Sequence, residues 1–305
     1  MTQAMIEGFV PVTVTPFDRS GAVDHERFAA LLQWYLGRGA GALCVGADNG
    51  ESWALDTEAL GQVVATAVRV AGDRVPVLAG AMGPASVTTS GAVSRARAAA
   101  EAGASAVLLS PPPYMMRATD DEIVARYAAV YQAAKLPLFA YNAPGHFGVN
   151  LGPDLLQSIY DTCDLIGLKE SSRAFDHSTR IIRRFGDRIS VMMGPGWFIM
   201  PGIALGARGF LSTGPDLLGE DSARICELAR GTPCEASRDL HERVSRLYHS
   251  LLDLGLGTPP APIKAALRML GQDMGVPADP VAPLSAEATG RLRDILIELG
   301  FEIRG

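Results

Sequence analysis

A lysine stands at the end of an apolar run that is typical of a buried strand. Residues 165–168 read Leu-Ile-Gly-Leu, and Lys169 follows them directly. The chain has only three lysines among its 27 basic residues, so arginine carries nearly all of the other positive charge. Because burial disfavours a charged amine, a lysine at such a place can become a neutral nucleophile, which an arginine cannot. We therefore expect Lys169 to condense with a ketone or aldehyde and form an imine.

An ion pair is the structural alternative for this lysine. Glu170 is adjacent in sequence, but neighbouring residues on a strand point to opposite faces of the sheet. An acidic partner for Lys169 would therefore have to come from a neighbouring strand or its loop.

A tyrosine ends the apolar run that precedes the run of Lys169. Tyr141 lies in the segment AYNAPG, and the strands of Tyr141 and Lys169 are expected to be neighbours in a parallel sheet. A phenol within reach of the lysine can carry protons while an imine forms and a C–C bond changes. The proline and glycine that follow would fix its direction. An aromatic side chain that only caps a strand is the alternative.

The loop after the second apolar run is rich in glycine and polar residues. Gly46 and Gly50 allow backbone N–H groups to converge on an anion, and Asp48, Asn49 and Glu51 add polar side chains. A small carboxylate is the natural ligand for such a loop. For Glu51, a surface acid or a helix cap is the simpler alternative.

Apolar runs and helical patterns alternate along the first 215 residues. The expected strands are residues 9–14, 41–45, 75–79, 106–109, 138–141, 165–169, 190–193 and 209–212. The helical patterns between them begin at capping residues such as Asp56 and Thr119, and several end at glycine, as at Gly72 and Gly103. Parallel strands need helical crossovers, so the alternation predicts an α/β fold, a (β/α)8 TIM barrel. A doubly wound open sheet is the rival, but no G-x-G-x-x-G follows the first strand.

Helical patterns alone fill the rest of the chain. They cover residues 215–230, 233–254, 260–270 and 286–299, and no Ser/Gly-rich linker precedes them. We expect a barrel over residues 1–215 and C-terminal helices over residues 216–305, packed on the barrel as one continuous structural unit.

Composition excludes several classes of function. The chain has 48% hydrophobic residues and a net charge of −6, which argues against general binding of nucleic acid. Because no apolar run reaches about 18 residues, we expect neither a signal peptide nor a membrane span. The four cysteines form no CxxC pair, so we expect reduced thiols in a cytoplasmic protein, with Cys44 buried in a strand.

Taken together, these motifs resemble the dihydrodipicolinate synthase / N-acetylneuraminate lyase family of class I aldolases. GADNGES is similar to the family's Gly-Thr-Thr-Gly-Glu loop, and SPPPYM, YNAPG, GLKESS and APIKAALRMLG follow in the family's order. The resemblance implies that Lys169 forms the Schiff base with pyruvate or another 2-oxo acid and that Tyr141 carries protons. It also implies that the loop 46–51 receives the carboxylate and that Gly194 and Ser212 line the same mouth. No metal or organic cofactor would take part, and the chain would form a homo-oligomer, a tetramer of tight dimers.

Two departures from the family concern proton transfer. Asp48 and Asn49 replace the Thr-Thr of the carboxylate loop, which is one residue longer through Ala47. Lysine-pathway members relay protons through that threonine and through a second tyrosine from a neighbouring subunit. Either Tyr114 or Met115 occupies the position of this second tyrosine and contributes to substrate binding.

A third departure concerns the second substrate. His146 stands where lysine-pathway members carry an arginine that binds the second carboxylate. We therefore expect His146 to contact the substrate and turnover of aspartate semialdehyde to be poor, unless Arg117 or Arg173 reaches the site.

Three functions fit these residues. The first is a lyase that makes or breaks a C–C bond between a 2-oxo acid and, for example, an aldehyde. The second uses the same imine for dehydration or deamination of a keto-deoxy sugar acid or a related 2-oxo acid. The third is a non-catalytic sugar-acid binding protein, which retention of Lys169 and Tyr141 argues against.

Overall fold

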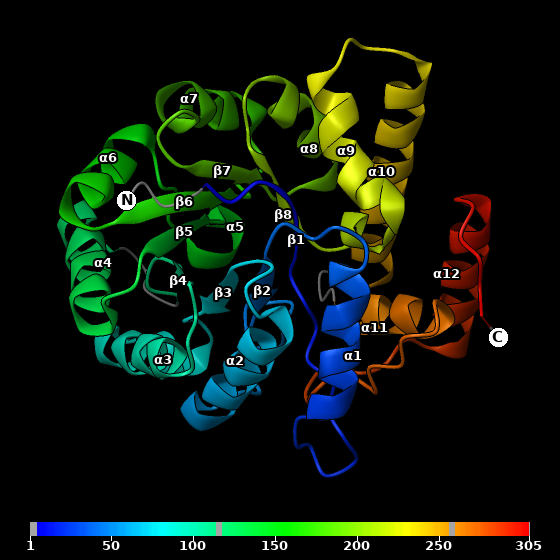
Figure 1. Ribbon diagram of the computed structural model, residues 1–305, viewed down its shortest axis with the longest axis horizontal. Coiled ribbons are helices and arrows are strands. Elements are labelled where there is room, and N and C mark those ends of the chain that lie inside the picture. Colours follow the sequence, from blue (N-terminus) through cyan, green and yellow to red (C-terminus); the bar gives the residue numbers. More distant parts are fainter. Residues whose placement is uncertain (1–4, 114–117, 256–259, 305) are drawn as a thin grey trace.

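Eight parallel strands form a closed barrel in the computed structural model, which describes residues 5–113, 118–255 and 260–304 (Figure 1). The strands are β1 (Gly8–Pro11), β2 (Leu43–Val45), β3 (Val77–Gly80), β4 (Ala106–Leu109), β5 (Leu138–Asn142), β6 (Leu165–Glu170), β7 (Ser190–Met193) and β8 (Gly209–Ser212). The order of hydrogen-bonded neighbours around the sheet is β1-β8-β7-β6-β5-β4-β3-β2. A parallel bridge between Val12 and Cys44 closes the last seam. The predicted (β/α)8 TIM barrel is confirmed, and Cys44 is buried in a strand as predicted.

Helices surround the barrel and connect successive strands. The helices of the ring are α1 (His25–Leu36), α2 (Thr57–Ala71), α3 (Thr89–Glu101), α4 (Asp120–Ala134), α6 (Pro153–Thr162), α7 (Phe175–Phe185), α8 (Gly196–Ala204) and α9 (Glu220–Arg230). Short turns of helix lie at η1 (Pro84–Ser86), α5 (Pro144–Phe147) and η2 (Pro215–Leu217). The predicted caps form: Asp56 accepts the Ala59 N–H at 2.8 Å, and Thr119 makes a reciprocal capping box with Glu122. These caps begin helices whose apolar faces pack on the sheet.

Side chains of the strands alternate between two apolar layers. On β5, Phe139 and Tyr141 belong to the cluster inside the barrel, whereas Leu138 and Ala140 pack beneath the surrounding helices. The same alternation places Gly167 and Lys169 on the inner face of β6, with Leu168 outside. The side chains of Tyr141 and Lys169 are therefore both directed into the barrel.

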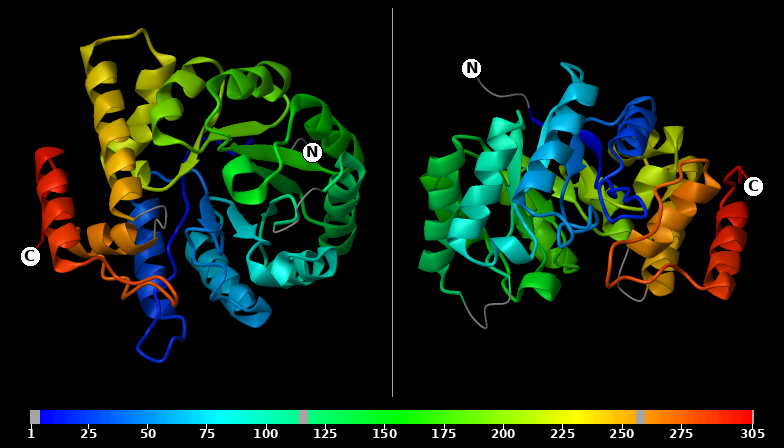
Figure 2. Two further views of the ribbon diagram at one scale, coloured as in Figure 1. Left: turned by 180° about the vertical axis from the view of Figure 1, so that it is seen from behind. Right: turned by 90° about the horizontal axis from the view of Figure 1, so that it is seen from below.

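The C-terminal helices gather at one side of the barrel (Figures 1 and 2). They are α10 (Glu235–Leu254), α11 (Pro260–Met269) and α12 (Ala286–Glu298). Helix α10 packs on α8 and α9, and both α11 and α12 contact it. Helix α9 packs on β1 and α8 and thus lies in the ring of helices around the barrel. Along the described ranges, no helix combines the length and apolarity needed to cross a membrane.

Candidate active site

Tyr141 and Lys169 are direct neighbours across the β5–β6 pair. They are in register at the carboxyl ends of their strands. The Lys169 Nζ lies 4.0 Å from the centre of the Tyr141 ring, and the lysine side chain is only 5% exposed. The barrel thus brings the predicted nucleophile and the predicted proton carrier into contact.

Asp48 joins these two side chains from the loop after β2. Its Oδ2 accepts a hydrogen bond from the Tyr141 hydroxyl at 2.7 Å, and its Oδ1 lies 3.6 Å from the Lys169 Nζ. The Asn49 N–H donates to the same Oδ1 at 3.0 Å. The ion pair that the sequence left open for Lys169 therefore exists, with Asp48 as the acid. We call Asp48, Tyr141 and Lys169 the lysine cluster.

Electrostatics assigns different protonation states to the acid and the phenol. Burial acts against the charge of Asp48, but the Lys169 ammonium and hydrogen bonds from Tyr141 and Asn49 hold the pKa of Asp48 below its usual value. Burial, together with the charge of Asp48, raises the pKa of Tyr141 well above its usual value. Near neutral pH, Asp48 is an acceptor and Tyr141 is a donor.

A cavity of about 390 Å³ opens above the lysine cluster. Its walls come from the carboxyl ends of the strands and from α10 and α11. The sequence-predicted residues that line it are Asp48, Asn49, Tyr141, His146, Lys169, Gly194 and Ser212. Gly46, Gly50 and Glu51 are not among its lining residues, and Tyr114, Met115 and Arg117 lie outside the described residues. The volume suits a small organic acid together with a second small molecule.

The two glycines of the β2 loop allow close packing beneath the cavity. Gly46 has φ of 64°, and a Cβ atom there would lie 2.4 Å from the Leu60 Cδ1. A Cβ atom on Gly50 would lie 2.9 Å from the Thr13 carbonyl oxygen. Glycine at these positions lets the loop fold so that Asp48 can reach Lys169.

Glu51 turns away from the lysine cluster. It has φ of 58° and is fully buried. Its carboxylate pairs with the Lys264 Nζ of α11 at 2.6 Å and accepts the Ala278 N–H at 2.5 Å. The structure therefore places Glu51 between the barrel and the C-terminal segment instead of in the cavity.

Sequence reasoning missed the contribution of the C-terminal helices to the cavity. Tyr248 and Leu251 of α10 and Ile263 of α11 line it. Their spacing marks only amphipathic helices, and the sequence alone does not show which surface such a helix covers. Arg173, considered above only as an alternative to His146, also lines the cavity, with φ of 59°. Burial raises the pKa of Tyr248, and the nearby Arg173 guanidinium offsets part of that effect.

The donor set suits organic acid–base chemistry. An amine, a phenol and a carboxylate meet at the floor of the cavity, and Ser212 and Thr213 are among its lining residues. Within the described ranges, no group of three or more His, Cys, Asp or Glu side chains is placed to hold a metal ion. The arrangement can form an imine and move protons beside it.

Comparison with known proteins decides the family. The model of the Dihydrodipicolinate synthetase family matches residues 5–299. The chain is 32% identical to 4-hydroxy-tetrahydrodipicolinate synthase of Syntrophobacter fumaroxidans over 300 aligned residues. The alignment covers 97% of this chain and 99% of that protein. The chain belongs to the dihydrodipicolinate synthetase family. It is thus a lyase of the class I aldolase type, which works through a lysine Schiff base.

Solved structures of the dihydrodipicolinate synthetase family match nearly the whole chain. Dihydrodipicolinate synthase from Aquifex aeolicus matches with a TM-score of 0.89 at 27% identity, over 98% of this chain and 100% of that one. The chloride-inhibited dihydrodipicolinate synthase from Acinetobacter baumannii, complexed with pyruvate, matches with a TM-score of 0.89 at 26% identity, over 97% and 99%.

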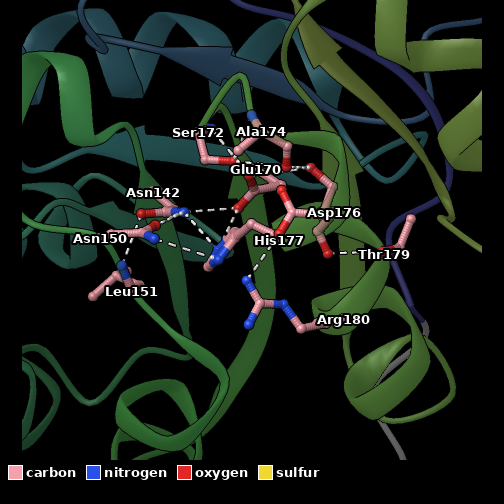
Figure 3. A network of polar contacts seen from close by, with 11 residues as sticks. Asn142, Asn150, Leu151, Glu170, Ser172, Ala174, Asp176, His177, Thr179 and Arg180 are labelled. Carbon is pink, nitrogen blue, oxygen red and sulfur yellow. Dashed lines mark hydrogen bonds and ion pairs between the residues drawn. The ribbon is translucent and has the colours of Figure 1, made fainter.

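In this family member, a polar network that includes Asn142, Glu170 and His177 lies at the ends of β5 and β6 (Figure 3). Asn142 and Glu170 are paired in register one residue beyond Tyr141 and Lys169. The Asn142 Nδ2 donates to the Glu170 Oε2 at 2.8 Å, and the Ser172 N–H donates to the Glu170 Oε1 at 3.0 Å. The first bond joins the ends of β5 and β6 beside the reactive side chains, and the second holds the start of the loop after β6.

The loop after β6 is also held by close backbone packing. The Gly194 N–H donates to the Glu170 carbonyl oxygen at 2.8 Å. A Cβ atom on Gly194 would lie 1.9 Å from the Ser171 Oγ, so glycine lets the β6 and β7 loops approach each other. Gly194 therefore shapes the cavity wall through its lack of a side chain.

Proposed function

We propose that Lys169 forms a Schiff base with pyruvate or another 2-oxo acid, and that the enzyme then makes or breaks a C–C bond with an aldehyde. The observation that supports this most directly is the contact of the buried Lys169 amine with Tyr141 and Asp48 at the floor of the cavity. Pyruvate is bound in the structure of the Acinetobacter baumannii relative.

The lysine imine supplies the electrophilic activation. Once protonated, it accepts electrons from the bond next to the former carbonyl carbon, so that bond can break or form. In this proposal, Tyr141 is the proton carrier because its hydroxyl is a donor within the lysine cluster.

The hydroxyl of Ser212 is proposed to bind the carboxylate of the 2-oxo acid. Ser212 is 3% exposed and lines the cavity, and its Oγ has no hydrogen-bond partner among the described residues. Asn49 lies on the same wall, where its Nδ2 donates to the Thr213 Oγ1 at 2.5 Å. A buried hydroxyl without a partner is costly, and a bound carboxylate would satisfy it.

Borohydride trapping tests the assignment. The protein is incubated with pyruvate, reduced, digested and mapped by peptide mass. The expected adduct is on Lys169, and the matched variant Lys169→Arg should give none. An adduct on the exposed Lys135 or on Lys264, which is paired with Glu51, would contradict the proposal.

Dehydration or deamination by the same imine is the second candidate. Product analysis with a panel of keto-deoxy sugar acids separates it from C–C cleavage, because only cleavage releases two carbon fragments. A protein that binds these acids but forms no trapped imine would instead be the non-catalytic binding protein.

We also propose a homo-oligomer, a tetramer of tight dimers, in the cytoplasm. The oligomer is supported by the family-like motifs, and the location by four free cysteines, of which three are buried. Sedimentation at micromolar concentration should give a mass several times the 32.2 kDa of one chain. A single species of one chain mass would contradict the oligomer.

A further inference from the structure

We infer that Asp48 is the proton acceptor of the site and that, with Tyr141, it forms a proton path contained within one chain. The inference rests on the proposed Schiff base at Lys169. It gives Asp48 a different role from the carboxylate binding expected of its loop.

The geometry places Asp48 between the two groups that must exchange a proton. One carboxylate oxygen faces the Lys169 Nζ at 3.6 Å, and the other accepts from the Tyr141 hydroxyl at 2.7 Å. The Asn49 N–H fixes the orientation of the carboxylate. Each carboxylate oxygen of Asp48 has its own partner. Asp48 can therefore accept a proton from Lys169 through one oxygen and pass a proton to Tyr141 through the other.

Charge argues against Asp48 as the receptor of the substrate carboxylate. Two anions side by side in a largely buried cavity repel each other strongly. The acid already has a cation beside it in Lys169. A 2-oxo acid would therefore direct its carboxylate away from Asp48, toward the hydroxyl side of the cavity.

The proton balance of imine formation closes within the lysine cluster. Asp48 takes a proton from the Lys169 ammonium, and the neutral amine adds to the carbonyl carbon, giving a carbinolamine after a proton moves from nitrogen to oxygen. The C–O bond then breaks as the Tyr141 hydroxyl donates a proton to the leaving oxygen. Asp48 returns its proton to Tyr141, leaving a protonated imine and one water. The total charge is unchanged.

Other titratable groups also face Asp48 and must be considered. Cys44 lies below it on β2, His146 approaches from α5, and Tyr248 approaches from α10. Each of these groups, His146 included, can contribute to a measured pH dependence. The effect of Asp48 is therefore best measured as the ratio of variant to wild type at each pH, which cancels a shared contribution of His146.

The rate of imine formation with pyruvate tests the inference. Timed borohydride quenching is carried out between pH 6 and pH 8 on the wild type, on Asp48→Asn and on the exposed control Asp73→Asn. Proton transfer from Lys169 to Asp48 takes no proton from solvent, so the wild-type and control rates should change little with pH. In Asp48→Asn the rate should fall roughly 10²–10⁴-fold at pH 7. The rate of imine formation in Asp48→Asn should then increase about tenfold for each unit by which the pH is raised, as for an amine that loses its proton to water.

A second variant distinguishes loss of the base from loss of structure. In Asp48→Ala, added formate should restore part of the rate in a concentration-dependent way, because formate can occupy the vacated space and accept the proton. The formate test on Asp48→Ala does not depend on Asp48→Asn, so it still tests the role of Asp48 if Asp48→Asn folds poorly.

The outcomes separate this inference from the proposed function. A wild type that forms no Lys169 adduct overturns the proposed Schiff base itself. A wild type that forms the adduct, with Asp48→Asn equally fast and equally flat in pH, overturns only the role of Asp48. A higher KM for pyruvate at unchanged maximal rate would show that Asp48 only contacts the substrate.

Discussion

The Lys169 ammonium lies over the face of the Tyr141 ring, 4.0 Å from its centre, on adjacent strands in register. An ammonium group and an aromatic face attract each other electrostatically. The amine must lose that proton before it can attack a carbonyl carbon, so a base is needed nearby. The arrangement thus explains why an acid at position 48 has functional consequences, although most of its loop lies outside the cavity.

Replacing Tyr141 with phenylalanine should lower kcat by roughly 10²–10⁴, the usual effect of losing a general acid or base. The ring still packs beside Lys169, so the fold and slow imine trapping should persist. Steady-state kinetics and pyruvate trapping measure the two effects. Tyr131→Phe, a phenol on the outer helix α4, is the matched control and should behave like the wild type. Near wild-type turnover in Tyr141→Phe would remove the phenol from the mechanism.

Glu170→Ala should destabilise the protein by about 3 kcal/mol. The substitution removes the buried carboxylate that accepts from the Asn142 amide and from the Ser172 N–H, although the Asn142 amide keeps the Asn150 Oδ1 as an acceptor. Urea denaturation measures the loss, and Asp154→Asn, at an exposed ion pair with Arg184, should change stability by less than about 1 kcal/mol. Well below its melting temperature, Glu170→Ala should still be trapped at Lys169. Unchanged stability would mean that the network is not required to hold the strand ends together.

The Glu51–Lys264 pair should matter for stability and not for substrate binding. Lys264→Met leaves a buried acid unpaired, which should cost about 3–5 kcal/mol. The double variant Glu51→Gln with Lys264→Met should recover part of that loss. Because neither side chain lines the cavity, KM for pyruvate should change less than about twofold in the double variant, well under the tenfold that 1.4 kcal/mol represents. A stable double variant with a much higher KM would show that Glu51 reaches the substrate.

Arg173 should bind a second carboxylate at the cavity wall. A hydrogen bond to a charged group contributes about 1.5–3 kcal/mol, so Arg173→Ala should raise KM for aspartate semialdehyde roughly 10–100-fold. Imine formation with pyruvate should be unaffected, as should turnover of an uncharged aldehyde. His146→Ala, assayed in parallel, shows which of the two side chains recognises the carboxylate.

The expectation of poor semialdehyde turnover rested mainly on His146, which stands where lysine-pathway members carry an arginine. A wild-type kcat/KM above about 10⁵ M⁻¹s⁻¹ for aspartate semialdehyde would contradict it. If Arg173→Ala abolished that activity, Arg173 would be identified as the cation that the sequence motif lacked. Equal effects of Arg173→Ala on charged and uncharged aldehydes would exclude carboxylate recognition.

Asp216 should make the protein less stable as pH rises. Burial raises the pKa of Asp216 from 3.8 to about 7. The folded protein therefore binds this proton more tightly than the unfolded chain. Its stabilising contribution is complete below about pH 4 and is lost as pH rises through about 7. Asp216→Asn should remove this dependence. Its free energy of unfolding, measured relative to that of the wild type, should therefore increase by on the order of 4 kcal/mol as the pH is raised from 4 to 8.

Denaturation at several pH values, with the exposed Asp187→Asn as control, checks this expectation. The control should track the wild type at every pH. A constant difference between Asp216→Asn and the wild type would show that Asp216 is ionised in both states over this range.

The strands were predictable because short apolar runs are bounded by caps and glycines. The predicted strands at 106–109, 190–193 and 209–212 coincide with β4, β7 and β8. The direction of Glu51 was not predictable from its motif. Glu51 has a left-handed backbone, and its carboxylate pairs with Lys264 of α11 instead of lining the cavity.

By itself, the sequence determined the alternation of strands and helices that is typical of a barrel, the family-like motifs and the place of Tyr141 and Lys169 at the ends of successive strands. Strand alternation and parallel pairing follow from local periodicity, so they can be read along the chain. Only the tertiary structure decided that Asp48 pairs with Lys169, that Arg173 lines the cavity and that α10 and α11 complete the wall. These contacts join segments that are distant in sequence. They depend on how loops and helix faces pack in three dimensions, which residue spacing within any one segment does not encode.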